Sequence, residues 1–237
     1  MPIFIAIPTF QRADTFRKKT YTKIIQKYKL EKYITLFITG DTSAYKEVSP
    51  ELKMVKSPKG LNNTLNFISD YYPLGAKIVI MDDDITRITK LSGDKLVPIN
   101  DAYSLFNKTF GIMKNVGASL GGYYHMSNSG FMKTSSSPIT TDLRFIVGTL
   151  YCYINRRIKY SMGGKSDAAF TIENYKRDGK VVRLNHYAVS YDFNANTESA
   201  EDTNKFISKY SKFISRVITH KDGSTSFFLK KNPKTEE

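Results

Sequence analysis

The order of apolar runs and helix-like stripes in the first third of the chain indicates an α/β fold. Two helices are predicted at residues 15–30 and 61–72, because apolar side chains recur there every three or four positions and Pro73 ends the second helix. Short apolar runs with the length of strands lie at 3–7, 35–39, 53–56 and 77–81. The resulting order of strand, helix, strand, strand, helix, strand favours a largely parallel sheet.

The middle of the chain continues this alternation with less regular spacing. Residues 101–115 and 168–176 have helical patterns, and 181–184 has the pattern of a strand. We interpret residues 117–122, which are small, as a flexible segment and residues 143–156 as one long strand-like segment. The expected body of the protein is therefore a single domain, residues 1–195.

The C-terminal residues, 196–237, are expected to form a basic extension packed on this domain. A predicted amphipathic helix has one apolar face made by Phe206, Tyr210, Phe213, Ile214 and Val217. Beyond it, Asp222–Gly223 is a dipeptide typical of the turn of a hairpin.

Composition adds a strong charge and an expected compartment. The 237 residues carry a formal net charge of +14, so a polyanionic partner would be attracted over long range and released by salt. No apolar run reaches the roughly 18 residues that a membrane span needs. Cys152 is the single cysteine, which excludes an intramolecular disulfide and fits a reducing cytoplasm. Its apolar neighbours indicate a core residue rather than a nucleophile.

Three adjacent carboxylates follow the strongest of the predicted strands. Lys77–Met81 runs directly into Asp82, Asp83 and Asp84. Like charges at this spacing repel one another and raise each other's pKa, so a positive group is expected to offset them. Mg²⁺ or Mn²⁺ prefers oxygen ligands, and ligands of open α/β sheets bind at the carboxyl ends of strands. The triplet therefore predicts a divalent cation site; the simpler alternative is a solvated acidic turn.

Four features, taken in order, resemble a nucleotide-sugar glycosyltransferase of the GT-A fold. The segment 5–12, Ile-Ala-Ile-Pro-Thr-Phe-Gln-Arg, is similar to the opening of that fold, and Asp82–Asp84 resembles its DxD motif. Gly163–Asp167 resembles its acidic motif at the start of a helix, and His186 its late metal-binding histidine. The resemblance covers about residues 3–191 and implies a Rossmann-type mixed sheet flanked by helices, with a C-terminal helical extension.

This resemblance also implies roles for individual residues. It assigns Asp82 to the ribose of a UDP-sugar donor and Asp84, with His186, to Mn²⁺ or Mg²⁺, while Asp83 could support either. It places further residues around the nucleotide, with Asp41 near the base: Thr9, Gln11, Arg12, Asp41, and Asn62 or Asn63.

Asp167 is the residue that the resemblance implies as general base. In inverting members of the fold, an acidic residue at this helix start deprotonates the acceptor hydroxyl. The usual pattern has two acidic residues together, whereas Ser166 precedes Asp167 here. A helix cap is therefore an alternative role for Asp167, and Glu173 and Asp142 are alternative bases.

Within this fold, the chain looks most like the base J and TET-associated DNA glycosyltransferases, which are often viral or phage-encoded. This similarity implies transfer of a sugar, with glucose expected, to a 5-hydroxymethylpyrimidine in DNA. The net charge suits such an acceptor, and aromatic residues could contact an extruded base beside Lys133: Tyr123, Tyr124 and Phe131. For several of these aromatic residues, the composition favours a place in the core instead. The alternatives are a transferase acting on a protein or glycan and a non-catalytic nucleic-acid-binding module.

Overall fold

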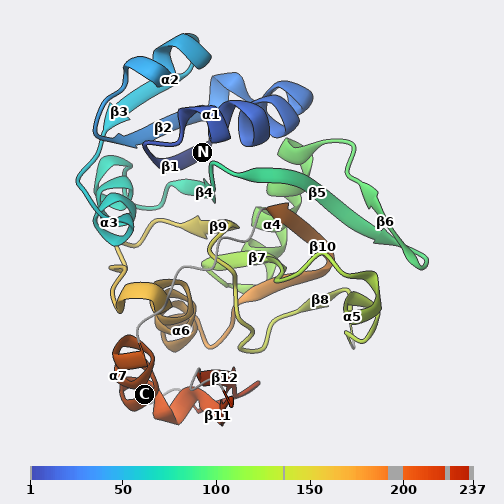
Figure 1. Cartoon of the computed structure of the whole chain (residues 1–237). Helices are drawn as coiled ribbons and strands as arrows, with labels where there is room; N and C mark the ends of the chain where they lie inside the picture. Colours follow the sequence, from blue (N-terminus) through green and yellow to red (C-terminus); the bar gives the residue numbers. More distant parts are fainter. Residues whose placement is uncertain (1, 136, 192–199, 222–224, 235–237) are drawn as a thin grey trace.

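The computed structural model describes residues 2–135, 137–191, 200–221 and 225–234, and its centre is a ten-stranded mixed sheet (Figure 1). Strands β3, β2, β1 and β4 are mutually parallel, and β9 continues the sheet in the opposite direction. Along the sheet the order is β3 (Lys53–Lys56), β2 (Ile34–Thr39), β1 (Ile3–Phe10), β4 (Lys77–Met81), β9 (Leu150–Ile154), β7 (Leu120–Tyr124), β10 (Val182–Tyr191), β5 (Ile85–Ser92) and β6 (Lys95–Pro98), with β8 (Ile139–Thr140) beside β10. The predicted α/β class is confirmed.

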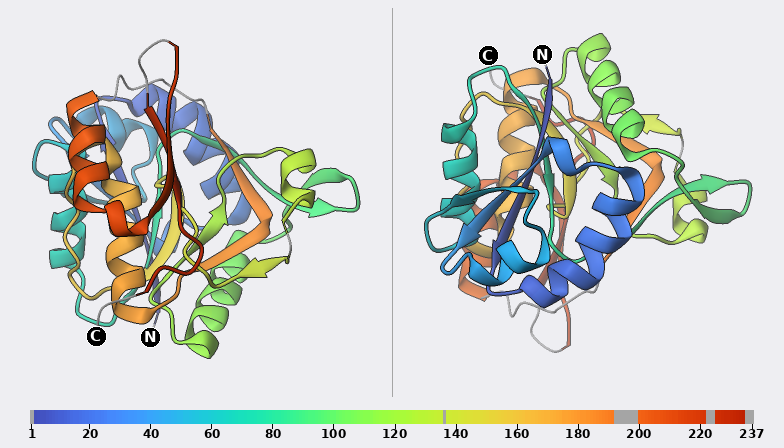
Figure 2. Two further views of the ribbon diagram at one scale, coloured as in Figure 1. Left: turned by 90° about the horizontal axis from the view of Figure 1, so that it is seen from below. Right: turned by 90° about the horizontal axis from the view of Figure 1, so that it is seen from above.

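Helices cover both faces of this sheet (Figures 1 and 2). On one face lie α1 (Ala13–Phe16), which continues into the π-helical segment η1 (Arg17–Gln26), and α4 (Ala102–Val116). On the other lie α3 (Leu61–Tyr71) and α6 (Ser166–Asp178), the latter preceded by the turn η3 (Gly163–Lys165). The remaining helical elements are η2 (Glu31–Tyr33), α2 (Ser43–Val48), α5 (Ser129–Lys133), α7 (Ala200–Lys209) and η4 (Ser211–Phe213). None of the helices within the described ranges is long and apolar enough to cross a membrane.

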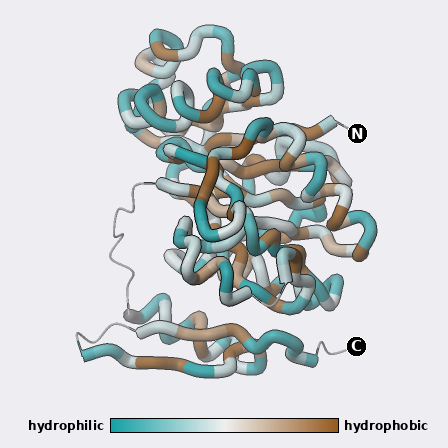
Figure 3. Tube along the Cα trace, turned by 90° about the vertical axis from the view of Figure 1, so that its right-hand side faces the viewer, coloured by the Kyte–Doolittle hydropathy of each residue, from teal (hydrophilic) through white to brown (hydrophobic). Residues whose placement is uncertain are grey.

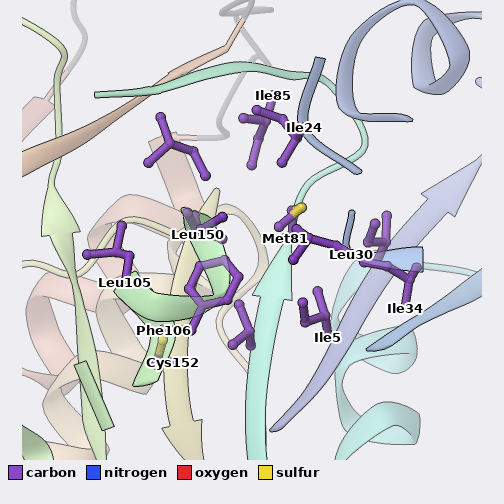
Figure 4. Packing of buried hydrophobic residues seen from close by; sticks show 14 of the residues in the cluster. Ile5, Ile24, Leu30, Ile34, Met81, Ile85, Leu105, Phe106, Leu150 and Cys152 are labelled. Carbon is purple, nitrogen blue, oxygen red and sulfur yellow. The ribbon is translucent and has the colours of Figure 1, made fainter. Parts of the chain in front are cut away.

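Alternation along the central strands divides the core into two clusters. On β4, Val79 and Met81 face η1 and α4, whereas Ile78 and Ile80 face α3 and α6. Figure 4 shows the first cluster, which also contains the buried Cys152. Burial raises the pKa of the Cys152 thiol to about 12, so the thiol is neutral and unreactive. The structure thereby confirms the core assignment of this residue.

The centre of the sheet differs most from the sequence-based expectation. The segment expected to be flexible, residues 117–122, includes the first three residues of the buried strand β7, whose two glycines allow close packing on each face. A Cβ atom on Gly121 would lie 2.8 Å from Met113 Sδ, and one on Gly122 would lie 2.5 Å from Ile146 Cγ2. The glycines therefore make room for neighbouring side chains rather than for chain motion. Of the segment expected as one long strand, 143–156, only β9 is extended as a strand.

The C-terminal extension also corrects an expectation. Helix α7 ends at Lys209, and Ile214 and Val217 belong instead to strand β11 (Ile214–Thr219), which pairs with β12 (Thr225–Leu229). The β-branched residues of this segment favour a strand over a helix. The expected hairpin is confirmed by this pairing, although Asp222–Gly223 itself lies outside the described residues. Figure 3 shows the hairpin as an elongated layer along the lower side of the molecule.

Candidate active site

The acidic triplet leaves the sheet at the carboxyl end of β4, beside the end of β1. Backbone and hydroxyl contacts fix its path: the Asp82 amide donates to Thr149 O (2.9 Å), and Thr20 Oγ1 on η1 donates to Asp82 O (2.9 Å). The Ile85 amide in turn donates to Thr20 Oγ1 (2.8 Å). The turn is therefore held from η1 and from the segment before β9, and its three side chains point in defined directions.

Asp83 is the structural support of the triplet. It is fully buried, and Thr9 Oγ1 donates to its Oδ2 at 2.5 Å. Arg12 forms a bidentate ion pair with the same carboxylate, with Nε 3.2 Å from Oδ2 and Nη2 close to Oδ1. Tyr45 OH lies 2.7 Å from Thr9 Oγ1 and accepts from the Arg12 amide. Both carboxylate oxygens of Asp83 thus have partners inside the protein, which favours a supporting role for this residue over the expected nucleotide contact.

Asp82 and Asp84 carry the remaining negative charge of the triplet. Burial, and then the neighbouring Asp84 and Asp83, raise the pKa of Asp82 well above its ordinary value. Arg12 Nη1 lies 3.6 Å from Asp84 Oδ2 and offsets only part of this charge. A divalent ion with oxygen ligands fits this set of donors. In the part of the chain that the structure describes, no three His, Cys, Asp or Glu residues form a complete metal-binding group.

The crowded carboxylates are expected to lower the stability of the folded protein, and this effect can be measured without a substrate. A raised carboxyl pKa means that the folded state binds a proton more readily than the unfolded state, so stability falls as pH rises through that window. We expect Asp82→Asn to raise the Tm of the ligand-free protein at neutral pH. A gain of about 1 kcal/mol would shift Tm by about 2–4 °C for a chain of this size.

Thermal unfolding at several pH values measures this effect. The gain should shrink toward acidic pH, where the wild-type carboxyl becomes protonated in the folded state. Asp94→Asn is the matched control, because the Asp94 side chain is 85% exposed and distant in sequence from the triplet. If the Asp82→Asn protein were no more stable than the control at neutral pH, the prediction that the crowded carboxylates destabilise the folded protein would be wrong.

A cleft of about 610 Å³ opens beside Arg12, between α1 and α2. Gln11, Arg12 and Asp41 line it together with Tyr45. Gln11 has a φ of 49°, a left-handed conformation that non-glycine residues adopt infrequently and that is often found at functional loops. Asp41 accepts from the Ser43 amide at 3.1 Å, and its hydrogen bonds with Ser43 lower its pKa. The structure thus gathers three of the expected nucleotide contacts around one cleft.

The two asparagines expected near the nucleotide lie elsewhere. Asn62 and Asn63 are in the first turn of α3 and do not line the cleft beside Arg12. Asn63 Nδ2 donates to Lys59 O (2.9 Å), which is a contact within its own helix start.

Asp167 approaches the triplet from the opposite side, in the first turn of α6. Its Oδ1 accepts from the Ala168 amide (2.7 Å) and its Oδ2 from the Gly148 amide (3.3 Å). Its negative charge is close enough to contribute to the raised pKa of Asp82. The two alternative bases are engaged elsewhere: Glu173 accepts from Tyr210 OH (3.0 Å), and Asp142 pairs with Arg144 (2.9 Å).

The structure does not bring His186 to Asp84, which corrects the expected metal ligand. Antiparallel pairing places Tyr191 of β10 opposite Ile85, the residue after Asp84. His186 lies five positions earlier on the same strand, roughly 16 Å away at about 3.3 Å per residue. There it lines a separate pocket of about 170 Å³ with Lys90 and other residues. The sequence placed His186 after a strand, whereas it lies within a longer one.

Tyr45 and Tyr191 are site residues that the sequence did not reveal. Tyr45 lies on α2, a six-residue helix too short to show a periodic pattern. The β10–β5 register places Tyr191 opposite Ile85, next to the triplet. Burial raises the pKa of Tyr191, and so do the charges of Asp82, Asp167 and Asp84. Tyr191 lies at the carboxyl end of β10, so it could have been recognised as a site residue only if the full length of that strand had been predicted.

The aromatic residues expected to contact an extruded base are mostly part of the core. Tyr123 and Tyr124 are buried, whereas the Phe131 side chain is 55% exposed on α5. Lys133 pairs with Asp94 at the turn between β5 and β6. Tyr123 and Tyr124 are therefore core residues, as the alternative prediction has it, and of the three rings Phe131 is the one exposed for a stacking contact.

Comparisons with known proteins agree with this geometry. The model of the TET-associated glycosyltransferase family matches residues 1–199. Glucosyl-3-phosphoglycerate synthase from Mycobacterium tuberculosis, solved with Mg²⁺ and UDP, is 10% identical and has a TM-score of 0.56 over 96% of this chain and 87% of its own. The same enzyme solved with Mn²⁺, UDP and glucosyl-3-phosphoglycerate, also 10% identical, has a TM-score of 0.52 over the same shares.

A third solved structure, TarS 1–349 from S. aureus, is 11% identical and has a TM-score of 0.55. The alignment covers 87% of this chain and 63% of that one, so the chain spans less than two thirds of the TarS fragment. A comparison with curated protein sequences gave no match. At these identities the structures establish the fold alone. The match over residues 1–199 shows that the chain belongs to the TET-associated glycosyltransferase family and is a glycosyltransferase.

Proposed function

We propose that the protein transfers a sugar from a UDP-sugar to the hydroxymethyl group of a 5-hydroxymethylpyrimidine in DNA, with Mn²⁺ or Mg²⁺ at the acidic triplet. The observation that carries the transferase chemistry is the proximity of Asp167 to the triplet: the Gly148 amide donates to Asp167, and the Asp82 amide donates to the carbonyl of the next residue, Thr149. At this edge of the sheet, Asp82 and Asp84 suit a diphosphate with its cation, and Asp167 offers a carboxylate to the incoming hydroxyl of the acceptor.

The donor occupies the cleft beside Arg12 in this proposal. Asp41 faces the base and Asp82 the ribose, while Asp84 supplies a ligand to the ion. The ion, when bound, offsets the negative charge that grows on the leaving diphosphate. Arg12 contributes a second, permanent positive charge at the same place, because its bidentate pairing with the buried Asp83 holds it beside Asp84.

The acceptor approaches from the side of α6. Asp167 accepts the proton of the acceptor hydroxyl as the hydroxyl oxygen forms its bond to the anomeric carbon. The bond from that carbon to the diphosphate oxygen breaks in the same step, and UDP leaves with its electron pair. Direct attack of this kind inverts the configuration at the anomeric carbon.

The choice of DNA as acceptor is supported by the family description and by charge. The family is described as TET-associated, and TET-type oxidation would supply hydroxymethylated bases. The chain has 36 lysine and arginine residues against 22 acidic ones, an excess suited to contacts with phosphates. With a protein or glycan acceptor, the excess of positive charge would have no comparable role in binding.

Nucleoside mass spectrometry tests the proposal. The protein is incubated with Mn²⁺, a panel of nucleotide sugars, and duplex DNA that contains 5-hydroxymethylcytosine or 5-hydroxymethyluracil; unmodified duplex is the control. The expected result is a gain of one sugar mass on a hydroxymethylated nucleoside with one or more UDP-sugars. Hydrolysis of the nucleotide sugar without any mass gain on DNA would overturn the DNA acceptor and favour a protein or glycan.

A further inference from the structure

The segment that follows the family match forms a unit of its own, with several exposed cations. The TET-associated family model ends at residue 199, and α7, η4, β11 and β12 come after it. The described part of this segment has two acidic residues, Glu201 and Asp202. It has eight basic ones: Lys205, Lys209, Lys212, Arg216, Lys221, Lys230, Lys231 and Lys234. Over the full sequence, residues 200–237 have eight basic and five acidic residues and residues 1–199 have 28 and 17, so the two parts are about equally basic. What can bind a polyanion is therefore the set of exposed cations on this unit rather than its net charge.

One side of this unit is firmly attached to the body of the protein. Phe206, Tyr210 and Phe213 are buried in the same apolar cluster as α3 and α6. The Leu143 amide donates to Lys231 O (2.7 Å), which joins the end of the hairpin to the segment between β8 and β9. The hairpin therefore has a fixed position relative to α6.

The other side of the hairpin is open. Phe228 is 52% exposed on this side, which is opposite to the side of Phe227 and its ladder partner Val217. Arg216 stands opposite Phe228 in the β11–β12 ladder, so a guanidinium and an aromatic ring are neighbours on the exposed surface. Arg216, Lys221 and Lys230 are all exposed to solvent.

This unit lies next to the start of the helix that carries Asp167. Lys165 Nζ lies 5.6 Å from the centre of the Phe227 ring on β12. A Cβ atom on Gly163 would lie 2.5 Å from an Asp202 carboxylate oxygen, so α7 packs closely against η3. Both contacts fall within four residues of Asp167 along the chain.

We propose that the β11–β12 ribbon is a docking surface for duplex DNA that holds the acceptor beside Asp167. Its cations suit the closely spaced phosphates of a polyanion, and a two-stranded ribbon has the dimensions that the major groove admits. A membrane surface fits less well, because Phe228 and Val217 are too few apolar side chains for interfacial insertion. This inference rests on the proposed DNA acceptor.

Charge-neutral variants of the full-length protein test the ribbon. The triple variant Arg216→Gln, Lys221→Gln, Lys230→Gln removes three exposed cations from the ribbon. The matched control, Lys32→Gln, Lys53→Gln, Lys114→Gln, removes three exposed cations from other surfaces. Binding of an unmodified duplex is measured against salt concentration, and sugar transfer is measured both to hydroxymethylated duplex and to the free hydroxymethylated nucleoside.

The ribbon variant should bind duplex about tenfold more weakly at about 0.1 M salt, with a salt slope lower by about one for each phosphate that the protein no longer neutralises. Its KM for duplex should rise while kcat and transfer to the free nucleoside stay unchanged, and its Tm should match that of the control. Equal duplex binding by the two triple variants would overturn the inference. So would binding of wild type to phosphatidylserine vesicles that exceeds binding to duplex. A wild-type protein that modifies no DNA but hydrolyses UDP-sugar would instead overturn the proposed function.

Discussion

The Asp84→Ala variant is expected to lose sugar transfer by about 10³-fold or more, which corresponds to about 4 kcal/mol of transition-state stabilisation. Asp84 is buried at the end of β4 with Arg12 Nη1 3.6 Å away, so its carboxylate is fixed where a diphosphate would pass the arginine. Removing it leaves Asp82 and Arg12 in place but takes away a ligand oxygen for the ion. The fall should appear in kcat/KM for the nucleotide sugar.

Two further measurements separate this effect from misfolding. Isothermal titration of UDP in the presence of Mn²⁺ should show weakened binding, and the protein should unfold at a Tm no lower than wild type because a crowded negative charge has been removed. Asp94→Ala, at the exposed turn between β5 and β6, is the control and should keep wild-type transfer. If Asp84→Ala retained both DNA binding and transfer, the triplet would not be the donor site.

Predicting the sheet from sequence succeeded where strands are buried on both faces. The runs at 3–7, 35–39 and 77–81 lie in β1, β2 and β4, and their parallel order follows from the helices between them. The same reasoning failed for β7, because glycines carry no apolar side chain to reveal a strand. Its position in the sheet depends on Met113 and Ile146, which are distant in sequence and fill the space above each glycine.

The candidate site was predictable to the extent that its residues follow strands. Asp82 and Asp84 come directly after β4, and Asp167 lies in the first turn of a helix, so topology alone brings them to one edge of the sheet. The role of Asp83 was not predictable, because its partners Thr9 and Arg12 come from another strand and the loop after it. His186 was misplaced because no local pattern indicates that β10 extends to Tyr191.

The second large effect is expected at Asp167, which is the proposed general base. The structure does not make it a helix cap, because Lys165 is the N-cap of α6 and Asp167 lies inside the first turn. The side-chain oxygen of asparagine at this position can still accept from the Ala168 or Gly148 amide. It cannot take a proton from an acceptor hydroxyl. Asp167→Asn should therefore keep the Tm and the affinity for UDP and Mn²⁺ while kcat for transfer falls by about 10²–10⁴-fold.

Asp167→Ala also removes the hydrogen bonds from the Ala168 and Gly148 amides, each typically worth about 1 kcal/mol, and so should lower both kcat and Tm. Glu173→Gln and Asp142→Asn serve as controls, since these carboxylates pair with Tyr210 and Arg144 and should be dispensable for the chemistry. A pH profile gives an independent readout, because the fall in wild-type kcat toward acidic pH that reflects protonation of the base should be absent in the residual activity of Asp167→Asn. Full transfer by Asp167→Asn would leave Asp167 only its role at the helix start, and would direct the search for the base to Glu173, Asp142 and Tyr191.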